Sequence, residues 1–233
     1  MLDVRSLQSD FRLETDDREV PGGSASVVDE DSLWKNAEIV GFVNEAQREI
    51  VRRTWILRDR ASLPVTAGEP YVELPENFME PRGRGQLTNA RTAPVLRNFN
   101  ELFQEQAEDY GIQGVGAWDG ATGPPRFMCF DDMDGVVRLV PEPVEDDTLE
   151  LAYYRWPAHV ARRTDKLDVV DERYRRAYLH WMKHLAYSKQ DADALDLQRS
   201  QMFEARFNAE ISRLYGEARR SSRRAGTVRY GGL

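Results

Sequence analysis

The sequence predicts an α+β fold, in which N- and C-terminal helices form a helical bundle and a small β-sheet or sandwich is inserted between them. Apolar residues recur with helical spacing near both ends of the chain and alternate with polar residues in its middle. An arginine-rich segment without an apolar period follows the last helix. The predicted parts are residues 1–63 (N-terminal helices), 64–157 (mainly β), 158–220 (C-terminal helices) and 221–233 (a flexible, extended C-terminal arm).

Two helices are predicted before the β region. Val4, Leu7 and Phe11 are spaced three and four residues apart, which indicates a short helix over residues 4–13, and a loop follows at residues 21–24. A second helix is predicted to begin near Ser32, a residue type that favours the N-cap position. Its apolar residues fall on one stripe: Ile39, Val43, Ala46, Ile50 and Leu57.

The middle of the chain is predicted to form short strands. Residues 65–75 read as two strands around a turn, and residues 126–130 and 136–140 as a hairpin. Gly135 supplies the positive φ angle that the tight turn of this hairpin needs. A further strand is predicted from Leu149 to Trp156-Pro157, and a helix from Asn100 to Tyr110, closed by Gly111.

Two further helices are predicted after the β region, capped by Asp171 and Asp191. The inward residues expected on the first are Tyr174, Tyr178, Trp181, Leu185 and Ser188. Those expected on the second are Leu195, Phe203, Phe207, Ile211 and Leu214.

The composition is that of a soluble folded protein, with 233 residues of which 41% are apolar and 31% are charged. No run approaches the roughly 20 apolar residues of a membrane helix, so no membrane partner is expected. The N-terminus has no basic-then-apolar signal pattern, so we expect no export by that route. Cys129 is the single cysteine, which excludes an internal disulfide and a multi-cysteine zinc site.

The net charge of −8 is unevenly distributed along the chain. Residues 1–30 contain eight acids and three arginines, whereas residues 216–233 contain one acid and five arginines. The acidic body is expected to repel nucleic-acid phosphates.

His180 and His184 are the strongest candidate for a metal site, because their i, i+4 spacing lets two imidazoles reach one zinc ion. The metalloprotease pattern needs a glutamate directly after the first histidine, and Trp181 stands there. Asp168 and Asp171 suit helix capping better than a metal site. A metal-dependent hydrolase that uses His180, His184 and His159 is the alternative from another functional class.

Other motifs favour structural roles. The glycine-containing segment 114–120 lacks the spacing of a dinucleotide fingerprint, and no nucleophile-elbow pattern occurs. Cys129 is expected to be a buried structural thiol. Asp131, Asp132 and Asp134 resemble a calcium loop but lack the bidentate glutamate, since Pro141 stands at its position. We therefore predict no catalytic residue, no metal site and no cofactor.

The arginine-rich end has three interpretations. It is an inert solvated helix end, a nucleic-acid tail, or a peptide that docks into a partner. Its sequence is interrupted by serine and glycine and holds one aromatic residue, which is weak for nucleic-acid binding and favours docking. The docking residues would be Arg219, Arg220, Arg223, Arg224, Arg229, Tyr230 and Leu233.

The order of several segments resembles the head-to-tail adaptor (connector or neck) proteins of tailed bacteriophages. The segments are Leu33-Trp34 leading into residues 38–50, residues 67–75, 138–143 and 149–157, and a helix that opens at 171–174 and continues past Asp191 and Asp193. The similarity spans most of the chain, and its strength lies in the order of these loose patterns. Residues 16–30 match least well.

This resemblance implies a non-enzymatic virion protein at the head–tail junction, made in the cytoplasm of the host bacterium. Copies would form a ring, typically a dodecamer, that lies beneath the portal protein and extends the DNA channel. The C-terminal segment would reach into the portal, and a downstream neck or tail protein (stopper, terminator or nozzle) would follow. Double-stranded DNA would pass through the lumen without specific binding.

Overall fold

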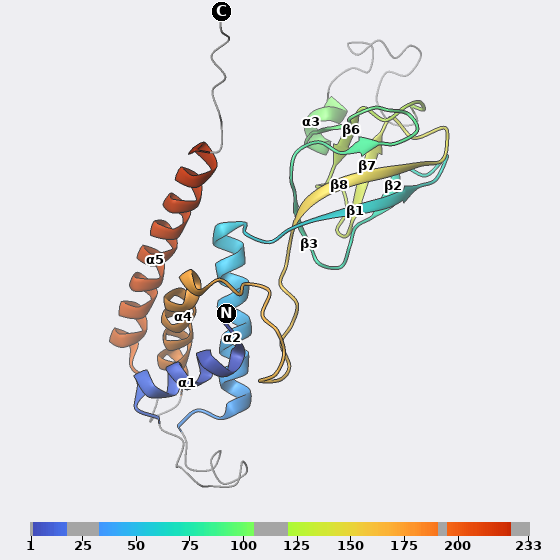
Figure 1. The fold of residues 1–233 in the computed structure, drawn as a ribbon. Helices are drawn as coiled ribbons and strands as arrows, with labels where there is room; N and C mark the ends of the chain where they lie inside the picture. Colours follow the sequence, from blue (N-terminus) through green and yellow to red (C-terminus); the bar gives the residue numbers. More distant parts are fainter. Residues whose placement is uncertain (1, 18–32, 105–120, 191–194, 225–233) are drawn as a thin grey trace, which may run out of the picture. The chain divides into compact units, whose positions relative to one another are not determined.

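In the computed structural model the chain divides into two compact units, Met1–Ile56 with Pro157–Leu233, and Leu57–Trp156 (Figure 1). The structure describes residues 2–17, 33–104, 121–190 and 195–224, of which 100, 103, 104 and 218–224 are described by their backbone alone. The first unit is helical and the second contains two small sheets, which confirms the predicted α+β class. The second unit begins seven residues before the predicted start of the β region at residue 64, because strand β1 (Arg58–Val65) follows the helical unit directly.

Helix α1 (Val4–Thr15) begins at a capping box, in which the carboxylate of Asp3 accepts a hydrogen bond from the backbone amide of Ser6 at 2.7 Å. Val4, Leu7 and Phe11 are buried, as their spacing predicts. Phe11 packs edge-to-face against Trp34, with ring centroids 5.4 Å apart. These contacts attach α1 to the residues that precede α2.

Helix α2 (Asn36–Thr54) begins later than predicted, with Lys35 as its N-cap residue. The prediction of an N-cap near Ser32 was wrong. The carboxylate of Glu38 accepts a hydrogen bond from the backbone amide of Lys35 at 2.9 Å, and this bond sets the start of the helix. Ser32 itself lies outside the described residues. The helix ends at Trp55, whose φ of 54° is left-handed, so Leu57 does not belong to its apolar stripe. The other four predicted residues of the stripe are buried.

Asp171 caps the next helical segment as predicted, since its carboxylate accepts from the backbone amide of Arg173 at 2.9 Å. A single 3₁₀ turn (Glu172–Tyr174) leads into α4 (Arg175–Ser188). Tyr174 and Tyr178 are buried, but Trp181, Leu185 and Ser188 are only partly so. The predicted stripe was too narrow because α4 packs against α1, α2 and α5, and its buried face therefore includes Ala177, Met182 and Ala186.

Helix α5 (Leu197–Arg224) packs along α4 through the predicted residues Phe203, Phe207, Ile211 and Leu214. The inward placement of Leu195 was wrong: this residue is 48% exposed and precedes the helix. Asp196 stands at the helix start and accepts from the backbone amide of Arg199 at 3.0 Å, while Asp191 lies outside the described residues.

The segment between the β unit and α4 is held by two amide side chains of α2. Asn44 donates to the carbonyl of Val160 at 2.7 Å and accepts from its amide at 2.8 Å. The side-chain oxygen of Gln47 accepts from the backbone amide of Asp168 at 2.9 Å and lies 3.1 Å from the hydroxyl of Tyr178. Burial raises the pKa of Tyr178, so this hydroxyl stays a hydrogen-bond donor.

In its described residues, the β unit contains two four-stranded sheets. The first has the order β1-β8-β3, with β4 also paired to β8, and its strands are β1 (Arg58–Val65), β8 (Asp147–Arg155), β3 (Phe78–Pro81) and β4 (Gln86–Leu87). The second has the order β2-β7-β6-β5, and its strands are β2 (Tyr71–Glu73), β7 (Val136–Val140), β6 (Phe127–Cys129) and β5 (Val95–Leu96). The β5–β6 pair is parallel, and the other pairs are antiparallel.

Alternate residues of both sheets form a shared core, in accordance with the two-residue period of strands. Its buried members are Leu63, Val65, Val72, Leu87, Met128, Val137, Leu139, Leu149 and Leu151. Gly85 approaches this core closely, since a Cβ atom there would lie 2.7 Å from a methyl carbon of Leu149 and from the sulfur of Met128. The predicted hairpin is present between β6 and β7, and Gly135 has a φ of 78° in its turn.

Helix α3 (Phe99–Gln104) covers a second cluster on β6 and β7, formed by Leu102, Ala121, Phe127, Cys129 and Val140. It begins at Phe99, one residue before the prediction, and the predicted continuation to Tyr110 and Gly111 lies outside the described residues. Strands β3, β4 and β5 had no counterpart in the sequence prediction.

Candidate functional site

Helix α5 carries four of the seven predicted docking residues. Arg219, Arg220, Arg223 and Arg224 lie in its last turns, so the part of the predicted extended arm from residue 221 to 224 is helical. Arginine is a good helix former, which accounts for this continuation. Their side chains, and the predicted docking residues Arg229, Tyr230 and Leu233, lie outside the described residues.

A row of arginines on the preceding part of α5 was missed by sequence reasoning. Arg199, Arg206 and Arg213 are seven residues apart, so they lie near one face of the helix. Arg220 continues the seven-residue spacing in the sequence. This seven-residue spacing is the signal that would have found them. All three are exposed.

Nearby groups orient the side chains of this row. Arg213 forms ion pairs with Glu210 at 2.7 Å and with Glu217 at 2.6 Å, and the bond from Glu210 raises the pKa of its guanidinium. Arg199 pairs with Asp196 at 3.3 Å, and Arg206 lies 5.4 Å from the centroid of the Phe203 ring. Exposed pairs of this kind contribute little to stability, so their main effect is to hold the guanidinium groups in place.

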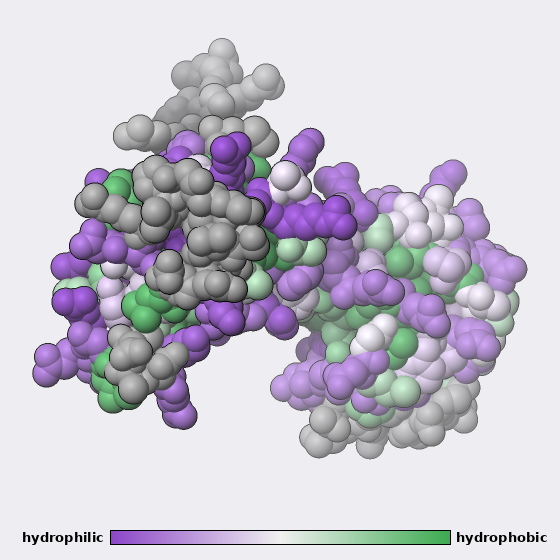
Figure 2. All heavy atoms as spheres, turned by 90° about the horizontal axis from the view of Figure 1, so that it is seen from below, coloured by the Kyte–Doolittle hydropathy of each residue, from purple (hydrophilic) through white to green (hydrophobic). Residues whose placement is uncertain are grey.

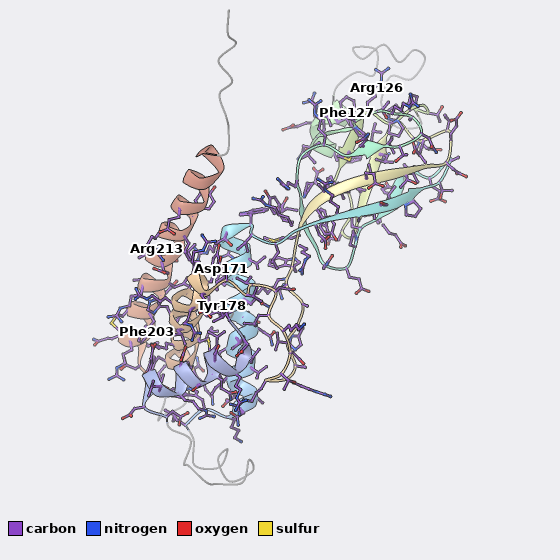
Figure 3. All side chains as sticks on the ribbon, viewed as in Figure 1. Arg126, Phe127, Asp171, Tyr178, Phe203 and Arg213 are labelled. Atoms are coloured by element: carbon purple, nitrogen blue, oxygen red, sulfur yellow. The ribbon has the colours of Figure 1, made fainter. Side chains whose placement is uncertain are left out.

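The inner face of α5 fixes the helix to α4 (Figure 3). Phe207 is fully buried and packs on Trp181, with ring centroids 4.7 Å apart. Phe203 stacks on Tyr187 at 5.8 Å, and the ammonium of Lys183 lies 4.8 Å from the centroid of the Phe203 ring. The described part of α5 is therefore held by a packed helix pair.

The histidines contribute to the same contact. The ring of His180 stacks on Phe203 with centroids 6.1 Å apart, and Nδ1 of His184 lies 3.0 Å from the hydroxyl oxygen of Ser200 on α5. Burial lowers the pKa of His180, and the positive charges of Lys183 and Arg206 lower it further.

The third histidine, His159, is exposed in the segment before α4. Within the described ranges, no group of three or more histidine, cysteine or acidic side chains is arranged to hold a metal ion. The structure therefore brings each of His180 and His184 to a side chain of α5, and the metal-dependent hydrolase gains no support from this geometry.

Carboxylates of the acidic turn between β6 and β7 bind other groups of the β unit. Asp131 accepts from the backbone amide of Phe99 at 3.0 Å and so caps α3. Asp132 forms an ion pair with Arg138 at 3.2 Å, and the Arg138 guanidinium lies 4.9 Å from the centroid of the Phe99 ring. Asp131 and Asp132, two of the three acids of this turn, therefore have a structural role within the β unit.

Cys129 is fully buried in β6. Burial raises the pKa of its thiol to about 12, and Asp131 contributes to the same shift. A thiol with this pKa stays protonated at neutral pH and is a poor nucleophile, so the residue has the structural role that was predicted for it.

Figure 2 shows one face, on which hydrophilic side chains (purple) predominate and hydrophobic ones (green) form small areas. Three apolar residues of α5 are exposed to solvent: Leu197, Met202 and Tyr215, with exposed fractions of 60%, 39% and 49%. None of the helices in the described parts of the chain combines the length and apolar character that a bilayer crossing requires.

Comparison with known proteins decides the family. The family model described as SU10 adaptor protein matches residues 3–230. The chain belongs to the SU10 adaptor protein family. The predicted resemblance to phage head-to-tail adaptors is thereby confirmed. No curated protein matches the sequence significantly.

Membership of the SU10 adaptor family makes the chain a phage adaptor and a structural component of the virion. It also implies interactions with portal and tail proteins of the phage. The match includes both the helical and the β unit, so the adaptor assignment applies to the chain as a whole.

Proposed function

We propose that this adaptor forms a homo-oligomeric ring, a dodecamer, that lies beneath the portal, extends the DNA channel and joins the capsid to the downstream neck or tail protein. The observation that carries the proposal is the family match over residues 3–230.

The C-terminal arm from Arg219 to Leu233 is the segment we assign to the portal. Helix α5 is packed on α4 and leads directly into this arm. Arginine forms bidentate bonds with carboxylates, so the five arginines of this segment suit an acidic groove on a partner. A terminal segment can also wrap a partner over a larger area than a rigid surface.

DNA passes through the lumen without specific binding in this proposal. The chain carries a net charge of −8, and an acidic wall repels phosphates. Adhesion of DNA to the channel would depend on released counterions and would slow its passage, so a lumen of the same charge sign as DNA favours transport.

The purified chain mixed with its portal tests the assembly directly. Mass photometry should show a stoichiometric complex that contains many copies of the 26.8 kDa chain. A chain that stays unassociated at every portal ratio contradicts the proposed function.

Removal of Arg219–Leu233 tests the arm. We expect loss of portal binding with an unchanged unfolding midpoint, because the residues that pack α5 on α4 precede the deletion. The circular dichroism signal should fall only by the contribution of the helical residues 219–224. A matched variant with glutamine at positions 219, 220, 223, 224 and 229 keeps the length and removes the charge. Portal binding by the truncated chain at the level of the full chain refutes the assignment of the arm.

A further inference from the structure

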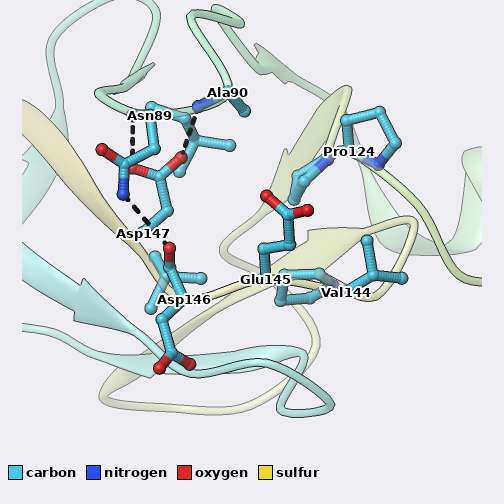
Figure 4. Close-up of a pocket in the computed structure, with 11 residues that line it drawn as sticks. Asn89, Ala90, Pro124, Val144, Glu145, Asp146 and Asp147 are labelled. Carbon is cyan, nitrogen blue, oxygen red and sulfur yellow. Dashed lines mark hydrogen bonds between the residues drawn. The ribbon is translucent and has the colours of Figure 1, made fainter.

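The β unit contains a cavity of about 280 Å³ that the adaptor assignment does not explain (Figure 4). It lies between the segment before β8, the segment after β4 and the segment before β6. Its walls are mainly apolar and include Val65, Leu87, Pro124 and Pro143. Val144 belongs to the same lining and is 55% exposed, so the cavity is bordered by apolar surface that faces solvent.

The charged residues of the lining are all acidic: Glu145, Asp146 and Asp147. Asp146 accepts from the backbone amide of Ala67 at 2.8 Å, and Asp147 accepts from those of Asn89 and Ala90 at 2.8 and 2.9 Å. Burial raises the pKa of Asp147, but the bonds from these amides and from Thr148 and Thr88 outweigh it and lower the pKa below its ordinary value. Asp147 is therefore negatively charged and fixed in place.

Glu145 differs from its two neighbours. Figure 4 shows its carboxylate among the lining side chains on the side of Pro124, whereas the carboxylate of Asp146 points away from them. Among the described residues, no hydrogen bond or ion pair occupies the Glu145 carboxylate. It is the one charged group of the lining that remains open to a ligand.

Size and charge together define what fits. The volume of the cavity lies at the lower limit of the roughly 300–1,000 Å³ of small-molecule sites, and one long side chain fits within it. Apolar walls with a carboxylate suit arginine or lysine, because these side chains bury an apolar stem and keep a charged end. A metal ion would need several converging oxygen ligands, and two of the three carboxylates are already held by backbone amides.

We propose that this cavity receives an arginine or lysine side chain from an extended segment of the next neck or tail protein, with Glu145 as its ion-pair partner. The proposal rests on the proposed function, which assigns the portal to the C-terminal arm of the helical unit and leaves the β unit for a different partner. Glu145 is exposed in the free chain, and the apolar stem of an arginine or lysine packed on Val144 and Pro124 would exclude water from the ion pair.

Saturation-transfer NMR on the full chain tests the cavity itself. The probe is the capped peptide Gly-Val-Arg-Val-Gly, with a twin that has norleucine in place of arginine. We expect the arginine peptide to bind about tenfold more tightly than its twin, and Glu145→Gln to remove this difference. Glu73→Gln removes an exposed acid of the same unit outside the lining and should change nothing. Equal binding of the two peptides, or no binding, overturns the proposal.

Assembly with the natural partners tests the occupant. In particles built with Glu145→Lys, we expect the adaptor at its normal level on the portal and about tenfold less of the downstream protein. Normal attachment of the downstream protein overturns the proposal. Loss of the adaptor ring itself would identify a second copy of the chain as the occupant and would also overturn it. Failure of the unmodified chain to join the portal contradicts the proposed function instead, independently of peptide binding.

Discussion

At the scale of single residues, Gln47 couples α2 to the segment that returns from the β unit. Its side chain is fully buried and meets the backbone of Ala158, Asp168 and Val169 and the hydroxyl of Tyr178. Gln47→Leu keeps the volume but removes the acceptor of the Asp168 and Val169 amides and leaves the Tyr178 hydroxyl to the carbonyl of Val169, so we expect a loss of about 3 kcal/mol in the free energy of unfolding. Urea denaturation followed by circular dichroism measures it.

Glu45→Gln is the control for this prediction, since Glu45 is exposed on the same helix. Its effect should stay within about 0.5 kcal/mol. A loss for Gln47→Leu no larger than that of the control would show that the segment 158–169 is held by other contacts.

His180 gives the helical unit a dependence on pH. Burial, Lys183 and Arg206 lower its pKa in the folded state, while Glu14 and Glu210 act in the opposite direction. The unfolded chain therefore takes up this proton first as the pH falls below 6.5, and stability is lost below that pH and retained above it.

The slope from this one proton is at most about 1.4 kcal/mol per pH unit. Unfolding free energies measured from pH 7.5 to pH 5 should show it in the natural chain. His180→Phe keeps an aromatic ring against Phe203 and removes the titration, so its profile should be flatter. Identical profiles for the two chains would exclude His180 as the source.

At the scale of secondary-structure elements, the contact between α4 and α5 depends on a buried aromatic ring. Phe207 is fully buried between the two helices. Phe207→Ala should cost about 3–5 kcal/mol and lower the melting temperature of the helical unit, with Met202→Ala, 39% exposed on the same helix, as the neutral control. An equal effect of both substitutions in thermal unfolding would contradict the packing described for α5.

The same scale shows what sequence could and could not predict. The stripes of α1, α2 and α5 and the turn at Gly135 follow from residue spacing and local conformation, and these were predicted. Strands β3, β4 and β5 have two to four residues each and exist because β8 or β6 pairs with them, which no local pattern records. The start of α2 depends on Glu38 reaching back to Lys35, a bond that a search for small polar cap residues overlooks.

The candidate site divides in the same way. The arginine-rich end was predicted from its composition, because a cluster of charges along the chain can be read from the sequence alone. The cavity beside Glu145 joins three segments that are far apart in sequence, so only the folded chain brings its lining together. The pairing of His184 with Ser200 likewise depends on how α5 lies on α4.

At the scale of the whole molecule, the two compact units predict two unfolding transitions. Gly85→Ala places a methyl group 2.7 Å from atoms of Leu149 and Met128, so it should cost about 1–3 kcal/mol in the β unit alone. Phe207→Ala should lower the other transition. Calorimetry of the full chain separates the two effects, with a shift of about 4–8 °C expected per kcal/mol. A single transition that both variants move equally would show that the units unfold together.

The β unit also begins and ends at neighbouring positions. Arg58, at the start of β1, pairs with Tyr154 near the end of β8, and the amide of Arg155 donates to the carbonyl of Leu57 at 3.1 Å. A domain whose entry and exit strands are hydrogen-bonded partners behaves as a cassette, because it can be exchanged or deleted with a short linker across the gap. Such an exchange would leave the helices of the other unit with their own sequence and packing.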